Sequence, residues 1–194
     1  MATTAMGIGK HFQYLFGGDP LAAPARAVYD RIVGQARQPA FYGAQAIPDS
    51  LDGRFELVAL HAFLVLRRLK HGGGNAAGLA QALLDGLVLD MDRNLREMGV
   101  GDLGVGRRVK DMARGFYGRI AAYEAGLDGT DDLLAAALER NLFGTAAAAP
   151  ASVAAMAAYM RREAAALERQ SLADLLAGKV SFGAPPDPLG GDVT

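Results

Sequence analysis

Apolar residues recur along this chain with the spacing of α-helices, most clearly in residues 76–98. Leucine, valine and methionine side chains in this segment fall on one side of a helix: Leu79, Leu83, Leu84, Leu87, Val88, Met91, Leu95 and Met98. Asp85, Asp92 and Arg96 fall on the opposite side, and the last two stand in the i,i+4 order that favours an ion pair. The pattern predicts an amphipathic helix with one buried face.

Similar patterns, separated by turn-forming residues, predict further helices. They cover residues 25–37, 53–70, 109–123, 131–141 and 150–170, with a short last helix after Ser171. Residues 39–53 contain two prolines and two glycines and are predicted to form an ordered loop. No segment alternates apolar and polar residues as a half-buried strand does. The predicted fold class is therefore all-α, a single globular domain of about six to eight packed helices.

Local signals refine the predicted helix ends. Asp52 and either Thr130 or Asp131 are candidate N-caps, and residues 171–174 resemble a capping box. Gly115 and Gly118 are costly inside a helix, which indicates close approach by a neighbour.

The chain divides into three predicted parts. Residues 1–19 form a small amphipathic segment, with Ile8, Phe12, Leu15 and Phe16 at helical spacing beside Lys10, and it either docks on a membrane or partner or packs onto the domain. Residues 20–177 form the helical domain. Residues 178–194 are rich in glycine and proline and are predicted to be a flexible tail.

Composition excludes several classes of protein. The net charge of −1 argues against non-specific binding to DNA, and the absence of cysteine excludes disulfides and thiolate chemistry. The longest strongly apolar stretch, residues 57–66, is much shorter than the roughly 20 residues that a membrane span needs. We therefore expect a buried core helix there and no membrane crossing.

The candidate chemical motifs are weak. Residues 99–104 read GVGDLG and match a dinucleotide-binding fingerprint, but a predicted helix enters them where a strand is required, so a turn capped by Asp102 is favoured. His61 stands in an apolar run and is predicted to be a hydrogen-bonded core histidine, whereas His71 is predicted to face solvent. Asp90, Asp92 and Glu97 could form an acid–base set or simply cap helices and pair with surface cations. With no catalytic or metal-binding motif, we expect a protein that is not an enzyme and holds no cofactor or metal.

Basic residues gather in three short clusters: Arg67, Arg68 and Lys70; Arg107, Arg108 and Lys110; Arg161 and Arg162. They are interpreted as solvated helix faces. If they shared one side of the fold, they could contact RNA or acidic lipid headgroups.

Five stretches taken together resemble the ubiquinol–cytochrome c chaperone family. They are ARQPAFY (residues 36–42), IPDSLDGRFE (47–56), the pair Leu60-His61, DMDRNLREMGVGD (90–102) and FYGR (116–119), in that family's order and spacing from about Tyr29 to Phe143. The acidic–basic–glycine block of residues 90–102 is the most specific of them. Residues 86–89 lack the aromatic side chains expected there, which affects the details of any groove along this helix.

The resemblance implies an assembly factor for respiratory complex III. Mitochondrial members bind newly made cytochrome b and act with a small companion protein at the ribosomal exit. With no presequence visible, a bacterial relative is expected in the cytoplasm, peripheral to the inner membrane. Its expected partners are cytochrome b or another complex III subunit, with contacts to the ribosome, a companion protein or the membrane surface as further expectations. The predicted partner-binding residues are Asp90, Asp92, Arg96, Glu97, Gly99, Gly101 and Asp102. The alternative is that this block is only a structural helix–turn–helix corner.

Two other functions remain open from the residues. A small-molecule binder, for example for an isoprenoid, would have a closed apolar cavity, whereas a chaperone would have an exposed apolar groove. An enzyme would use the carboxylates of Asp90, Asp92 and Glu97.

Overall fold

The computed structural model describes residues 20–43, 47–144 and 148–186, and its regular elements are all helices. Eight helices follow in order: α1 (Ala22–Ala36), α2 (Pro39–Gly43), α3 (Leu51–Leu69), α4 (Gly74–Glu97), α5 (Asp102–Asp128), α6 (Asp131–Asn141), α7 (Pro150–Arg169) and α8 (Leu172–Leu176). The predicted all-α fold is confirmed. None of the helices within these ranges is both long and apolar enough to pass through a membrane.

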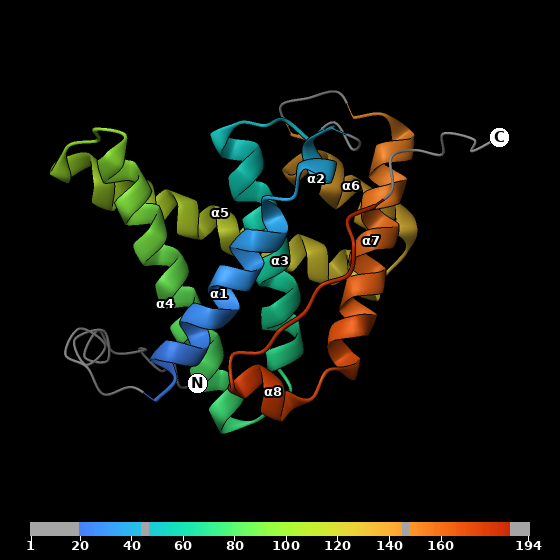
Figure 1. Cartoon of the computed structure of the whole chain (residues 1–194). Coiled ribbons are helices and arrows are strands. Elements are labelled where there is room, and N and C mark those ends of the chain that lie inside the picture. Colours follow the sequence, from blue (N-terminus) through green and yellow to red (C-terminus); the bar gives the residue numbers. More distant parts are fainter. Residues whose placement is uncertain (1–19, 44–46, 145–147, 187–194) are drawn as a thin grey trace, which may run out of the picture.

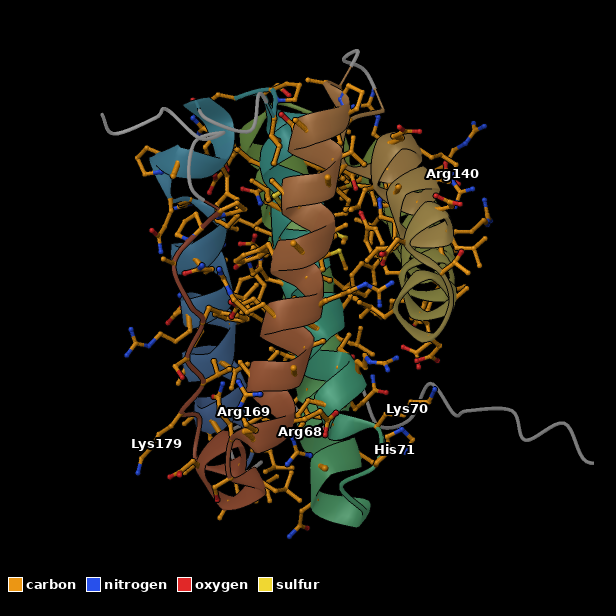
Figure 2. All side chains as sticks on the ribbon, turned by 90° about the vertical axis from the view of Figure 1, so that its right-hand side faces the viewer. Arg68, Lys70, His71, Arg140, Arg169 and Lys179 are labelled. Atoms are coloured by element: carbon orange, nitrogen blue, oxygen red, sulfur yellow. The ribbon has the colours of Figure 1, made fainter. Side chains whose placement is uncertain are left out.

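Helix α3 is the centre of the fold because its middle is buried on every side. Six consecutive residues, from Leu60 to Val65, are buried, and a helix that is buried all round belongs in a core. Helices α1, α4, α5 and α7 all pack against it. Figures 1 and 2 show the layers: α1 lies on one side of α3, α7 runs alongside it, and α5 with α6 covers the opposite side.

The two longest helices, α4 and α5, leave the core together and meet at a corner that projects from the body (Figure 1). Gly99 has φ +79° there, and its N–H donates to the carbonyl of Arg96 at 2.9 Å. Glycine enters this left-handed conformation without steric cost, which makes it the usual residue just past a helix C-terminus. The predicted helix–turn–helix reading of the GVGDLG motif is therefore correct, but Gly101 and not Asp102 is the N-cap of α5, and Asp102 lies in its first turn.

Several predicted helix ends are wrong in detail. Ser50, whose side chain accepts the Gly53 N–H at 3.1 Å, caps α3 in place of Asp52. Thr130 caps α6 as predicted, but Ser171 makes no side-chain cap. The predicted loop after Gln38 instead begins with the short helix α2, because Pro39 can start a helix and Phe41 buries its ring completely.

The glycines of α5 also behave differently from the prediction. A Cβ at Gly118 would meet nothing, so no neighbour approaches that position. Gly115 is approached closely, but by the side chain of Arg119 from the same helix.

The predicted flexible tail is wrong over residues 178–186, which pack as an extended strap between α1 and α7 (Figure 1). The Gly183 N–H donates to the buried carboxylate of Glu163 at 2.8 Å, and the ring of Phe182 meets His61 edge-on at 5.2 Å. The prediction rested on the glycine and proline content of residues 178–194. The strap is ordered by side chains of α1 and α7, and its own sequence does not indicate these contacts. The rest of the predicted tail, and the predicted amphipathic segment 1–19, lie outside the described residues.

Candidate functional site

A groove of about 890 Å³ opens beside the projecting corner. Its walls come from α1, the first turns of α3, the second half of α4, the first half of α5 and the end of α6. Leu51 and Met98, on its rim, are 56% and 50% exposed although both are large apolar residues. The groove is therefore open to solvent and offers apolar surface that the fold itself does not cover.

Methionines give the groove its character. Met91 and Met98 of α4 and Met112 of α5 line it together with Phe55 and Leu95. Methionine side chains are flexible and polarizable, so they can adapt to apolar partners of different shape. Grooves of this kind suit the apolar face of a helix.

An ion pair between Glu56 of α3 and Arg119 of α5 is set into the groove floor. The guanidinium donates twice to the carboxylate, with Nε reaching Oε2 at 2.5 Å and Nη2 bonding Oε1. The two side chains are only 10% and 22% exposed. Burial raises the pKa of Glu56, and the hydrogen bond and charge of Arg119 partly oppose that rise.

Gly115 explains how Arg119 reaches this position. A Cβ at residue 115 would lie 2.7 Å from Nη1 of Arg119, so only glycine leaves room for the guanidinium to fold back over its own helix. The guanidinium also lies over the ring of Phe55, 5.6 Å from its centroid. The local sequence of α5 thus positions the charge that neutralises Glu56.

A second polar pair lies on the α1–α4 side of the groove. The Tyr29 hydroxyl donates to Asp90 at 2.8 Å, and Asn94 donates to the same oxygen at 3.0 Å. Burial, followed by the hydrogen bond and charge of Asp90, raises the pKa of Tyr29 well above its ordinary value. Asp90 is therefore a satisfied hydrogen-bond acceptor that ties α4 to α1.

The predicted partner-binding block separates into two parts. Asp90 lines the groove, whereas the other six residues form the corner next to it. Arg96 pairs with Asp92 at 2.6 Å and also with Asp102, so it links the end of α4 to the start of α5. Glu97 is exposed, and Gly101 precedes the first turn of α5. The geometry supplies a structural role for the corner, and its contact with a partner stays a prediction.

The same geometry bears on the catalytic hypothesis. Asp90 bonds Tyr29 and lines the groove, whereas Asp92 bonds Arg96 and neither Asp92 nor Glu97 lines the groove, so only one of the three carboxylates is placed there. Within the described residues, no three metal-binding side chains come together.

His61 is the hydrogen-bonded core histidine that the sequence predicts. Its Nδ1 lies 2.7 Å from the Leu57 carbonyl, and its Nε2 lies 2.7 Å from the Tyr159 hydroxyl. Because a carbonyl only accepts, Nδ1 carries the proton and the Tyr159 hydroxyl donates to Nε2. Burial lowers the pKa of His61 to about 4.

Two of the basic clusters are partly neutralised by carboxylates of neighbouring helices. Arg67 pairs with Glu124 and Asp128, and Arg161 with Asp131, so much of their charge is locally neutralised. Figure 2 shows Arg68, Lys70, His71, Arg169 and Lys179 near the α8 end, while Arg140 stands at the other end on α6. His71 is exposed, as predicted.

Sequence reasoning missed most of the groove. Leu51, Phe55, Glu56, Met112 and Arg119 come from two helices that are far apart in the chain. Two signals pointed to these residues without showing that they meet: Gly115 four residues before Arg119 indicated a close approach, and the family-like stretches 47–56 and 116–119 contain Leu51, Phe55, Glu56 and Arg119.

The fold and the groove define a class: an all-helical protein with an open apolar surface suited to holding another polypeptide. The family model described as ubiquinol–cytochrome C chaperone matches residues 44–182, and the chain belongs to that family. The resemblance seen in the sequence is thereby confirmed.

Relatives agree with this assignment. Ubiquinol–cytochrome c reductase complex assembly factor 1 from Xenopus laevis is 26% identical over 136 residues, which cover 70% of this chain and 68% of the frog protein. The human protein is also 26% identical, over 81% of this chain and 53% of its own length. The chain thus spans only about half of the human relative.

A solved structure supports the fold along nearly the whole chain. The crystal structure of the Cbp3 homolog from Brucella abortus is similar with a TM-score of 0.78 and 37% sequence identity. The match covers 94% of this chain and 99% of that one.

Proposed function

We propose that this protein is an assembly chaperone for respiratory complex III, and that its groove holds a helix of newly made cytochrome b or of another subunit. Its relatives, which are named as ubiquinol–cytochrome c reductase complex assembly factors, support the first part. The open groove lined by methionine, leucine and phenylalanine supports the second. On this proposal the protein binds and releases a client and catalyses no reaction.

The size of the groove is compatible with a helical segment, and its open rim is the observation that favours a helix over a small ligand. A helix about 10 Å across that rises 1.5 Å per residue fills roughly 120 Å³ per residue, so 890 Å³ takes about two turns. A membrane helix that has not yet found its neighbours exposes apolar surface over far more than two turns. The groove would shield one segment of such a helix while the rest stays in the lipid.

The small-molecule alternative fits the geometry less well. A ligand pocket buries most of its ligand's surface, whereas this groove has a rim with half-exposed Leu51 and Met98. The open rim favours a partner that extends beyond the groove.

The corner block, residues 90–102, supports the α4–α5 wall of the groove. Arg96, held between Asp92 and Asp102, fixes the turn that follows Met98. We propose that Asp90 contacts the client and that the rest of the block positions this wall. Contacts with a companion protein, the ribosome or the membrane surface would use other faces.

Co-purification from native membranes in mild detergent tests the proposal. Cytochrome b should copurify with the wild type and be lost from Leu51→Asp/Met98→Asp, which places carboxylates on the apolar rim. The matched control is Tyr117→Asp/Leu133→Asp, because these two residues are 59% and 54% exposed but lie outside the groove. Absence of any complex III subunit from the wild type would contradict the chaperone assignment.

The same assay tests the block with Asp92→Ala/Glu97→Ala. Loss of cytochrome b in this folded variant would support a role of the corner in client binding. Full retention would leave the corner as a structural element only.

A further inference from the structure

The charged side chains that line the groove leave a net positive charge. Four of its charged side chains are already engaged: Glu56 by Arg119, Asp90 by Tyr29 and Asn94, Asp111 by Arg114, and Arg54 by Asp49. Arg119 is itself used by Glu56. Apart from Asp90, whose two partners are neutral, these groups contribute little net charge to an incoming partner.

Three arginines that line the groove have no such partner. Arg37 at the end of α1, Arg108 on α5 and Arg140 on α6 make no ion pair with any described residue, and all three are exposed. Among the described residues, the acidic lining residues Asp52 and Asp90 likewise make no ion pair, since Asp90 bonds only the neutral side chains of Tyr29 and Asn94. The groove therefore combines apolar surface with three exposed, unpaired arginines against these two carboxylates, an excess of one positive charge, although the whole chain has a net charge of −1.

From this arrangement we infer that the groove selects an amphipathic protein helix whose apolar face is flanked by Asp or Glu side chains. Such a helix places its apolar residues on Met91, Met98 and Met112 while its carboxylates approach Arg37 and Arg108. Charge complementarity of this kind sets specificity and association rate more than it sets total affinity. The inference rests on the proposed use of the groove and adds the charge of its occupant.

The chemistry also disfavours two other occupants. The Lys- and Arg-rich flanks that membrane helices carry on the cytoplasmic side would meet the unpaired arginines unfavourably, so the client segment held in the groove is not such a flank. The chain's own residues 1–19 carry Lys10 and a single acidic residue, Asp19, and so offer no net negative charge. A partner helix with acidic flanks is the occupant that the charges favour.

A pair of synthetic peptides tests the inference on the full chain. Both form an amphipathic helix of about three turns with the same leucine face, and one carries Glu at the flanking positions where the other carries Lys. Fluorescence anisotropy should give a dissociation constant for the Glu peptide at least about tenfold below that of the Lys peptide at low salt. This preference should shrink as the salt concentration rises, because exposed charges are screened.

Charge reversal places the interaction in the groove. Arg37→Glu/Arg108→Glu should abolish or invert the preference for the Glu peptide. The matched control is Arg31→Glu/Arg107→Glu, which makes the same change of charge on α1 and α5. Both residues are exposed, and neither lines the groove. This control should bind like the wild type.

Each other outcome overturns the inference in a distinct way. Equal binding of the two peptides would remove charge selection and leave the groove as an apolar docking surface. Equal loss in both charge-reversal variants would assign the effect to net charge and not to the groove. Peptide binding that begins only when residues 1–19 are deleted would assign the groove to the chain's own segment. Cytochrome b is measured only in the co-purification assay. A failure of the proposed function is therefore distinguishable from a failure of charge selection, which only the peptide assay measures.

Discussion

The ion pair between Glu56 and Arg119 allows a quantitative prediction. The Arg119→Ala variant leaves a carboxylate that is 10% exposed without its guanidinium. Removing one partner of a buried ion pair typically costs 3–5 kcal/mol, and since Arg119 is itself 22% exposed we expect a loss of about 3 kcal/mol at pH 8. The free energy of unfolding, measured by urea titration with circular dichroism, reports this loss.

The pH dependence of that loss identifies its cause. Burial already raises the pKa of Glu56, and the variant removes the group that opposes the rise. A carboxyl whose pKa is higher in the folded than in the unfolded state binds a proton on folding, so its contribution to stability is lost as the pH rises through the folded pKa. The deficit of Arg119→Ala relative to the wild type should therefore be smaller at pH 5 than at pH 8, by about 1 kcal/mol or more.

A neutral pair provides the control. Glu56→Gln/Arg119→Met removes both charges while keeping similar volumes, and it should recover most of the lost stability. The reasoning is refuted if Arg119→Ala lies within about 1 kcal/mol of the wild type at pH 8, or if the neutral pair is as unstable as the single variant.

Three further predictions concern the fold around the groove. Gly99→Ala should destabilise the protein by about 1 kcal/mol in thermal unfolding because residue 99 has φ +79°. Gly101→Ala should be nearly neutral because a Cβ at residue 101 meets nothing. Equal effects of the two substitutions would contradict this account of the corner. The buried Tyr123 hydroxyl has no partner among the described residues, so Tyr123→Phe should be neutral or slightly stabilising. Tyr159→Phe removes the donor to His61 and should lower the free energy of unfolding, measured in urea, by about 1–3 kcal/mol. The pKa of His61 is lowered from 6.5 to about 4, which keeps the ring neutral. The contribution of His61 to stability is therefore complete above pH 6.5 and falls by about 3 kcal/mol between pH 6.5 and pH 4. This loss should be absent in His61→Gln, and parallel curves of unfolding free energy against pH for the two proteins would disprove the prediction.

The fold was largely predictable because helical periodicity is a local property. The stripe of leucines and methionines in α4 and the breaks at glycine and proline depend only on neighbouring residues, and the structure has helices at those places. The strap of residues 178–186 was not predictable. Its order comes from Gln35, Glu163 and Gln170, which bond Gly183 or Ser181 and lie 11 to 148 residues away in the sequence.

The groove shows the same limit. The corner block of residues 90–102 was visible because it is continuous in the sequence and resembles a family motif. Glu56 and Arg119 are 63 residues apart and meet only because α3 packs against α5. Both residues stand in stretches that resemble the family, 47–56 and 116–119, but no periodicity of either helix shows that they pair beside the corner.

The central claim is that the groove itself touches the client, and site-specific photo-crosslinking tests this most directly. A photoreactive phenylalanine analogue is placed at Leu51 or Met98 on the groove rim, and at Tyr117 or Leu133 as exposed apolar positions elsewhere. The account predicts crosslinks to newly made cytochrome b from the two rim positions and none from the other two. Crosslinks from Tyr117 or Leu133 with none from the rim would contradict it and place the client on a different face.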